Sequence, residues 1–156
     1  MMSAIGLRRV SALAILVLLA ACNPSDRRPG LSLSGEPAAF ADDWSFTDAE
    51  KEIALEVSTP YFLPHSVTIW CASLDGALYV AAGSPEEKRW PGWVDEDPDV
   101  RLLIAGKVYE GRLEPVDDAP TTERLRATYA AKYQLDASGA ANPLRTVRYW
   151  RVAARG

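Results

Sequence analysis

The stretch from Gly76 to Asp118 decides the fold, and it reads GALYVAAGSPEEKRWPGWVDEDPDVRLLIAGKVYEGRLEPVDD. Its apolar run at 77–82 predicts a strand that ends in a Gly-Ser-Pro turn. After a short Lys-Arg-Trp segment and an acidic turn at 95–99, two further strands are predicted at 99–105 and 108–116. This order is typical of a small β-barrel with a helical insert, rather than a helix bundle or a parallel sheet.

Further strands are predicted on both sides of this stretch. Residues 66–73 form the first strand, and the Leu74-Asp75-Gly76 sequence is a hairpin turn into the second. Residues 145–152 alternate between the two faces of a last strand, after a loop at 138–143. The chain is therefore expected to be mainly β, with an antiparallel barrel and flanking helices.

Two helices are predicted beside the barrel. Thr47 and Glu50 fit a capping box, and apolar residues at helical spacing then continue to Val57 before Pro60 ends the helix. The second helix is expected to start at 117–120. Three large residues, spaced by four, line one of its faces: Leu125, Tyr129 and Tyr133.

The first 43 residues are not expected to belong to the barrel. Two arginines precede an apolar run at 10–20 that is too short for a permanent membrane span, and Leu19-Ala20-Ala21-Cys22 follows. This pattern resembles the bacterial lipobox, which implies a signal peptide at 1–21 and a lipid on Cys22. The alternative is a plain signal peptide with an incidental cysteine.

The lipobox reading implies a place in the bacterial cell. Lipid on Cys22 would hold the protein on a membrane of the cell envelope, facing the periplasm. Asn23 at the next position favours the outer membrane where there are two. Residues 22–43 are rich in Pro, Ser, Gly and Asp and are predicted to be a flexible tether, with the domain at 44–156.

Charge and cysteine content exclude two classes of protein. The chain has 17 basic and 21 acidic residues, and loss of residues 1–21 would change its net charge from −4 to −6. This acidic balance gives no electrostatic reason to bind nucleic acid. If Cys22 carries lipid, Cys71 has no partner in the chain, so a disulfide framework is excluded.

The order of short motifs from residue 66 to about 118 resembles the FMN-binding split-barrel superfamily, which includes pyridoxamine-phosphate oxidases and deazaflavin-dependent nitroreductases. Members carry a strand that ends in small residues, a loop, a lysine that heads a helix, an Asn-Pro or Asp-Pro pair, and another strand. The matching pieces here are 78–83, 84–88, 97–98 and 100–104. The resemblance implies a split barrel, FMN as cofactor, oxidoreductase activity and a homodimer.

The resemblance also implies a phosphate site at the bend after the second strand. Lys88 stands where the family places a basic phosphate ligand, and the residues expected to join it are Gly83, Ser84, Arg89 and Trp90. The alternative is a solvated Lys-Arg pair that balances the two preceding glutamates. The sequence departs from the family twice. His65 or Ser66 replaces an arginine of the first strand, and Pro91 interrupts the helix.

Other residues that could carry chemistry have simpler explanations. Trp70, Trp90, Trp93 and Trp150 either wall a pocket for a flat ring or pack in the core. The single histidine lacks partners at metal-ligand spacing, and the acidic turn lacks the EF-hand pattern, so no metal is expected. Cys71 shares a strand face with Val67 and Ile69, which predicts a buried, inert thiol.

Two functional classes remain open from the sequence. One is a lipid-anchored, FMN-dependent oxidoreductase for which no catalytic residue is identified. The other is a non-catalytic lipoprotein whose barrel binds another small anionic ligand or an envelope partner. Retention of a flavin by the purified protein would distinguish them.

Overall fold

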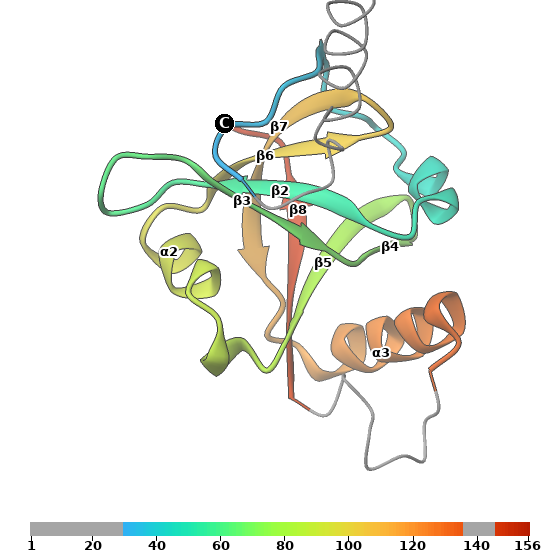
Figure 1. The fold of residues 1–156 in the computed structure, drawn as a ribbon. Helices are drawn as coiled ribbons and strands as arrows, with labels where there is room; N and C mark the ends of the chain where they lie inside the picture. The colour runs from blue at the N-terminus through green and yellow to red at the C-terminus, as the bar shows by residue number, and fades with distance from the viewer. Residues whose placement is uncertain (1–29, 136–145) are drawn as a thin grey trace, which may run out of the picture.

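The computed structural model describes residues 30–135 and 146–156. Within these residues, eight strands form one sheet in the order β3-β2-β6-β7-β8-β5-β4, with β1 paired to β7 (Figure 1). All pairs are antiparallel except β1 with β7. The strands are β1 (Glu36–Ala38), β2 (Ile53–Val57), β3 (His65–Ile69), β4 (Cys71–Leu74), β5 (Ala77–Gly83), β6 (Asp99–Ile104), β7 (Lys107–Pro115) and β8 (Val147–Ala153).

The sheet curls around a core, as the sequence predicted. Strands β3 and β4 end the path on opposite sides, yet only Trp70 separates them in the chain, so the two ends of the sheet meet. Strand β8 pairs with both β5 and β7. Its alternation is also confirmed. Trp150 lies in the barrel core, and Tyr149 lies in a second cluster on the other face.

Both predicted tight turns are present. Asp75 and Gly76 take φ angles of 53° and 77° between β4 and β5, and Ala105 and Gly106 take 49° and 80° between β6 and β7. Positive φ is the left-handed conformation that such two-residue hairpin turns need, and glycine adopts it without steric cost. The register of β6 on β7 follows from the second turn, with Ile104 opposite Lys107.

The second predicted helix is α3 (Ala119–Tyr133), which packs against the foot of the sheet (Figure 1). Asp118 caps it, because its carboxylate accepts a hydrogen bond of 2.8 Å from the Thr121 amide. Leu125 and Tyr129 are buried against the second cluster, and Tyr133 stacks on Trp70 with ring centroids 4.3 Å apart. The predicted apolar face is therefore the packed face.

The first predicted helix is wrong. Residues 45–49 form a short 3-10 helix, η2 (Ser45–Ala49), and residues 53–57 are strand β2. Thr47 is buried, and its hydroxyl donates to the carbonyl of Trp44 rather than forming a capping box. Because β2 is buried on both faces, it lacks the alternation that identifies a strand, and its apolar residues matched helical spacing by coincidence.

The predicted tether is also wrong over its described part, residues 30–43. Gly30 and Ser66 exchange backbone hydrogen bonds of 3.0 and 2.8 Å, and β1 pairs with β7. Leu33 is only 7% exposed, since it packs with Ala54, Leu103 and Val108. The folded part therefore begins before Trp44. The signal peptide, Cys22, the rest of the tether and the loop at 138–143 lie outside the described residues.

Candidate functional site

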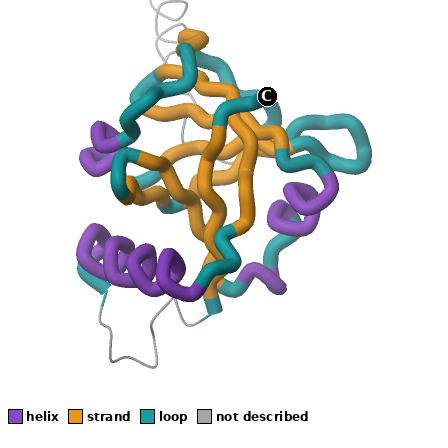
Figure 2. Tube along the Cα trace, turned by 180° about the vertical axis from the view of Figure 1, so that it is seen from behind, coloured by secondary structure: helices purple, strands orange, loops and turns teal. Residues whose placement is uncertain are grey.

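All five residues predicted to bind a cofactor line one cavity of about 750 Å³: Gly83, Ser84, Lys88, Arg89 and Trp90. The cavity lies between the end of β5, strand β3 and the short helix α2 (Trp90–Glu96). Figure 2 shows the molecule from behind, with α2 at the side of the barrel away from α3. The bend that follows β5 is therefore open to a ligand rather than sealed by packing.

The backbone of the bend explains how proline is accommodated there. Ser84 adopts a left-handed conformation, with φ of 46°, and a 3-10 turn, η3 (Pro85–Glu87), follows. Lys88 is extended, and α2 then begins with Pro91 in its first turn, where the missing amide hydrogen would have had no helical partner. Pro91 therefore starts a second helix instead of breaking the first.

The two basic side chains at the cavity rim form no ion pair with a carboxylate of the described residues. Among the described residues, neither Lys88 nor Arg89 forms an ion pair, so the predicted balance with Glu86 and Glu87 is not made. The Lys88 ammonium instead donates to the carbonyl of Gly83. Both basic side chains are exposed, which leaves their remaining donors accessible to an anion.

The amide of Ser84 is already in use. It donates a hydrogen bond of 2.8 Å to the carbonyl of Thr146, on the strand side of the bend. The backbone here therefore offers an anion less than the sequence suggested, which leaves the hydroxyl of Ser84 as the donor that this residue could contribute. Glu52 and Glu87 also line the cavity, so its wall carries charge of both signs.

The tryptophans divide between the cavity and the core. Trp70, Trp90 and Trp93 line the cavity, whereas Trp150 is fully buried in the barrel and its ring lies 5.0 Å from that of Trp90. Trp90 is itself only 4% exposed. Flat apolar surface for a ring is therefore supplied by Trp70 and Trp93, which are half-buried.

Two further aromatic residues belong to this site: Tyr61, which sequence reasoning missed, and His65, which it considered only as a replacement for the family's arginine. Tyr61 and His65 both line the cavity and make edge-to-face contacts with Trp93, with ring centroids 5.9 and 5.4 Å away. They lie some thirty residues before Trp93, so no local spacing could have joined them. Among the described residues, no group of three His, Cys, Asp or Glu side chains is arranged to hold a metal ion.

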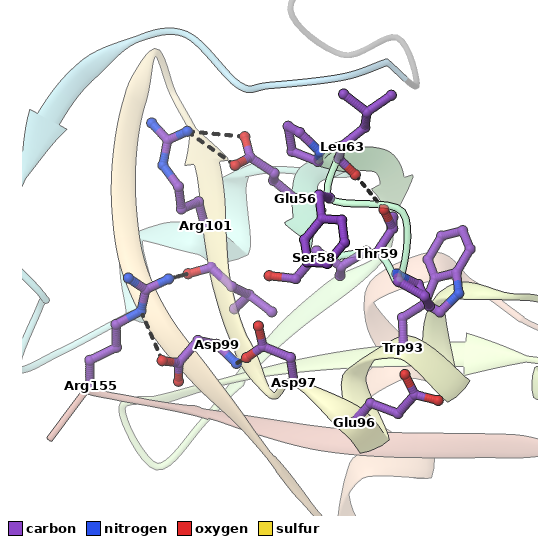
Figure 3. Close-up of a pocket in the computed structure, with 15 residues that line it drawn as sticks. Glu56, Ser58, Thr59, Leu63, Trp93, Glu96, Asp97, Asp99, Arg101 and Arg155 are labelled. Carbon is purple, nitrogen blue, oxygen red and sulfur yellow. Dashed lines mark hydrogen bonds and ion pairs between the residues drawn. The ribbon is translucent and has the colours of Figure 1, made fainter.

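A second cavity of about 430 Å³ lies on the other side of Trp93 (Figure 3). Both of its arginines are paired with carboxylates, and Glu96 and Asp97 leave the lining with an excess of negative charge. Arg101 pairs with Glu56 at 3.0 Å, and Arg155 lies 3.8 Å from Asp99 and donates to the carbonyl of Val100. These contacts lock the polar side chains to the protein, which makes this cavity the weaker candidate for an anionic ligand.

The acidic stretch at 95–99, which was predicted to be a turn, is mostly the end of a helix and the start of a strand. Asp95 and Glu96 belong to α2, and Asp99 begins β6, so only Asp97 and Pro98 connect them. The Arg148 guanidinium lies 2.6 Å from Asp95 and, by donating hydrogen bonds, lowers the pKa of that carboxyl. The stretch is a connector tied down by arginines.

Cys71 is buried in the barrel core with Ile69, as predicted. Burial raises the pKa of its thiol, although the ammonium of Lys132, 3.7 Å from the sulfur, acts in the opposite direction. A thiol that stays protonated is a poor nucleophile. Cys71 therefore offers no catalytic chemistry to the cavity.

Comparison with known proteins assigns the chain to a family. Residues 46–151 match the family described as "Uncharacterized protein conserved in bacteria (DUF2255)". The chain belongs to this family. No curated protein matches it. Among the described residues, no helix is both long enough and apolar enough to cross a membrane.

Solved structures similar to this member of the DUF2255 family share its fold. A conserved hypothetical protein from Mycobacterium tuberculosis aligns with a TM-score of 0.57 and 18% identity, covering 76% of this chain and 86% of its own. A putative 5-nitroimidazole antibiotic resistance protein from Bacteroides thetaiotaomicron gives 0.55 and 13%, covering 83% and 84%. A putative pyridoxamine 5'-phosphate oxidase from Listeria innocua gives 0.52 and 17%, covering 69% and 86%. The fold is therefore the antiparallel split barrel that the sequence predicted.

Proposed function

We propose that this protein binds FMN, or a closely related flavin, in the cavity at the β5–α2 bend and acts as a lipid-anchored oxidoreductase of the cell envelope. The observation that carries the proposal is the convergence of Gly83, Ser84, Lys88, Arg89 and Trp90 on one cavity. The split-barrel fold supports it, since similar structures include proteins described as a putative pyridoxamine 5'-phosphate oxidase and a putative 5-nitroimidazole antibiotic resistance protein.

The residues present fit the two ends of such a cofactor. Lys88 and Arg89 are exposed and lack carboxylate partners within the described part of the chain, so they can meet a phosphate. Trp70 and Trp93 offer faces and edges for a flat ring. A bound flavin would supply the redox chemistry, while the protein would supply binding and orientation. His65, one of the two residues (with Ser66) at the position where the resemblance implies an arginine, lies in the same cavity.

A non-catalytic role is the second candidate. Glu52 and Glu87 line the cavity as well, and the Lys88 ammonium is already directed at the carbonyl of Gly83. Both features weaken the attraction for a doubly charged phosphate. On this reading the barrel binds another small ligand or an envelope partner. The predicted homodimer, and the lipid on Cys22, stay predictions under either candidate.

Purification of the full chain tests the proposal. We expect a visible flavin band that stays with the protein through gel filtration, or, failing that, quenching of tryptophan fluorescence when FMN is added. Lys88→Ala should weaken FMN binding roughly 10- to 150-fold, because it removes a charge-assisted hydrogen bond worth about 1.5–3 kcal/mol. The matched control is Lys107→Ala, whose side chain is exposed at the β6–β7 turn and far from the cavity lining.

Two results would count against it. A protein with no flavin band and no quenching on titration would leave only the non-catalytic candidate. Equal FMN affinity in the wild type, Lys88→Ala and Lys107→Ala would mean that the phosphate is bound elsewhere.

A further inference from the structure

Most of the exposed large apolar side chains in the described part of the chain lie in or near one loop. Five large hydrophobic residues are exposed in the described part of the chain, and four of them are Leu31, Tyr61, Phe62 and Leu63, at 64%, 54%, 96% and 55%. Three of these lie in the loop that joins β2 to β3, residues 58–64, which we call the apolar loop. It projects beyond the sheet on the side of α2 (Figure 1, Figure 2).

The apolar loop is held in a defined shape. The amide of Phe62 donates to the carbonyl of Thr59 at 3.1 Å, and the Thr59 hydroxyl donates to the carbonyl of Leu63 at 2.6 Å (Figure 3). Phe62 has a φ of 61°, a left-handed conformation that is rare and costly for a bulky residue. The turn therefore presents the phenyl ring to the surroundings instead of folding it onto the barrel.

The first residues of the described chain lie beside strand β3, which follows this loop. Gly30, the first described residue, pairs with Ser66, and Leu31 is its neighbour. Phe62 lies four residues from Ser66, so it is at most about 14 Å away along an extended chain. Cys22 lies eight residues from Gly30, within roughly 29 Å by the same measure. A lipid on Cys22 would thus keep the bilayer within reach of the exposed apolar residues.

We propose that the apolar loop, with Leu31, inserts into the surface of the lipid bilayer to which the chain is anchored, an inference that rests on the proposed lipid at Cys22. Aromatic and aliphatic side chains at a bilayer surface bury apolar area that water would otherwise cover. A second hydrophobic contact beside the lipid anchor fixes the orientation of the domain. Because Tyr61 also lines the larger cavity, docking brings the mouth of that cavity to the lipid surface.

A tryptophan in place of Phe62 reports on this contact. Full-length protein bearing Phe62→Trp is isolated from membranes in its lipid-modified form and reconstituted into zwitterionic phosphatidylcholine vesicles, with or without brominated acyl chains. We expect the emission of the added tryptophan to shift to the blue and to be quenched by the brominated lipid. Phe46→Trp is the matched control, since Phe46 is 44% exposed on η2, at the opposite end of the sheet (Figure 1).

Transfer between vesicles gives a second readout. Phe62→Ser should make the lipidated protein move from donor to acceptor vesicles about tenfold faster, because burying a phenylalanine side chain favours the docked state by at least one factor of ten. Phe46→Ser should leave the transfer rate unchanged.

The outcomes separate this proposal from the others. Lipid on Cys22 with no quenching at position 62 would overturn the docking and leave the anchor standing. Absence of lipid on Cys22 would overturn the anchor and the docking together, while flavin binding is tested independently. A blue shift that needs no vesicles and grows with protein concentration would make the patch a contact between two copies, and the proposal would be wrong.

Discussion

Lys132 connects three separate parts of the chain through one ammonium group. Its Nζ donates hydrogen bonds of 2.9 Å to the carbonyl oxygens of Thr47 and Cys71, so α3 is tied to η2 and to β4. We expect Lys132→Met to lower the free energy of unfolding by about 1.5–3 kcal/mol, the usual contribution of hydrogen bonds to a charged donor. Urea unfolding followed by tryptophan fluorescence measures it. Lys107→Met, at an exposed turn, should have no effect.

Buried thiol and phenol groups make the stability sensitive to alkali. Burial raises the pKa of Cys71 above its ordinary 9.0, and those of Tyr129 and Tyr149 above 10.0. The folded protein therefore holds these protons more tightly than the unfolded chain. Their contribution to stability is complete below the ordinary pKa values and is lost as the pH rises above them. Urea titrations at neutral pH and in steps above it should show this decline.

The variant Cys71→Ala shows which part of the loss of stability at high pH comes from the thiol. In Cys71→Ala the decline should begin at a higher pH, because only the tyrosines remain to be ionised. A stability that stays flat as the pH passes 9.0 and 10.0 in the wild type would contradict the expectation.

Two glycines show how differently a helix and a strand tolerate a methyl group. A Cβ on Gly92, in α2, would meet nothing within 4 Å, whereas on Gly111, in β7, it would lie 3.0 Å from Val152 Cγ1 and 3.2 Å from the carbonyl oxygen of Ala153. Gly92→Ala should stabilise the protein by about 0.5–1 kcal/mol, because glycine loses more entropy in a helix. Gly111→Ala should lower Tm, since the backbone of β8 must move. Calorimetry measures Tm for both variants. A Tm of Gly111→Ala equal to or above that of Gly92→Ala would contradict the expectation.

The elements that the sequence predicted are those with a local signature. Asp75-Gly76 and Ala105-Gly106 mark their hairpin turns, and Asp118 marks the start of α3. Strand β2 has no such mark. Ile53, Ala54, Leu55 and Val57 are all buried, so burial on both faces removed the period of two that would have identified it.

Only part of the candidate site could be predicted from the sequence. Lys88 and its neighbours could be found because they follow one strand directly. The contacts of Tyr61 and His65 with Trp93 could not be predicted, because they exist only once the start of β3 and the loop before it lie beside α2. The charge of the cavity was also only half visible, since Glu52 approaches it from a different part of the chain.

At the scale of the whole molecule, the position of the N-terminal domain boundary affects the free energy of unfolding. Leu33 fills a space between Ala54, Leu103 and Val108, and β1 covers β7. A chain of residues 44–156 should therefore be less stable than one of residues 30–156 by about 2–5 kcal/mol, the range for removing a buried leucine side chain. Urea unfolding of both chains compares them. Equal midpoints would mean that residues 30–43 contribute nothing to the fold.

The pairing of β8 has a consequence for how the protein is made. Because this strand bonds to β5 on one side and to β7 on the other, the barrel cannot close until residues 147–153 have emerged from the ribosome. Without this strand, β5 and β7 would have no shared neighbour, and the sheet would be open between them. The two halves of the sheet are thus joined last, by the segment of the described chain that lies nearest its C-terminus.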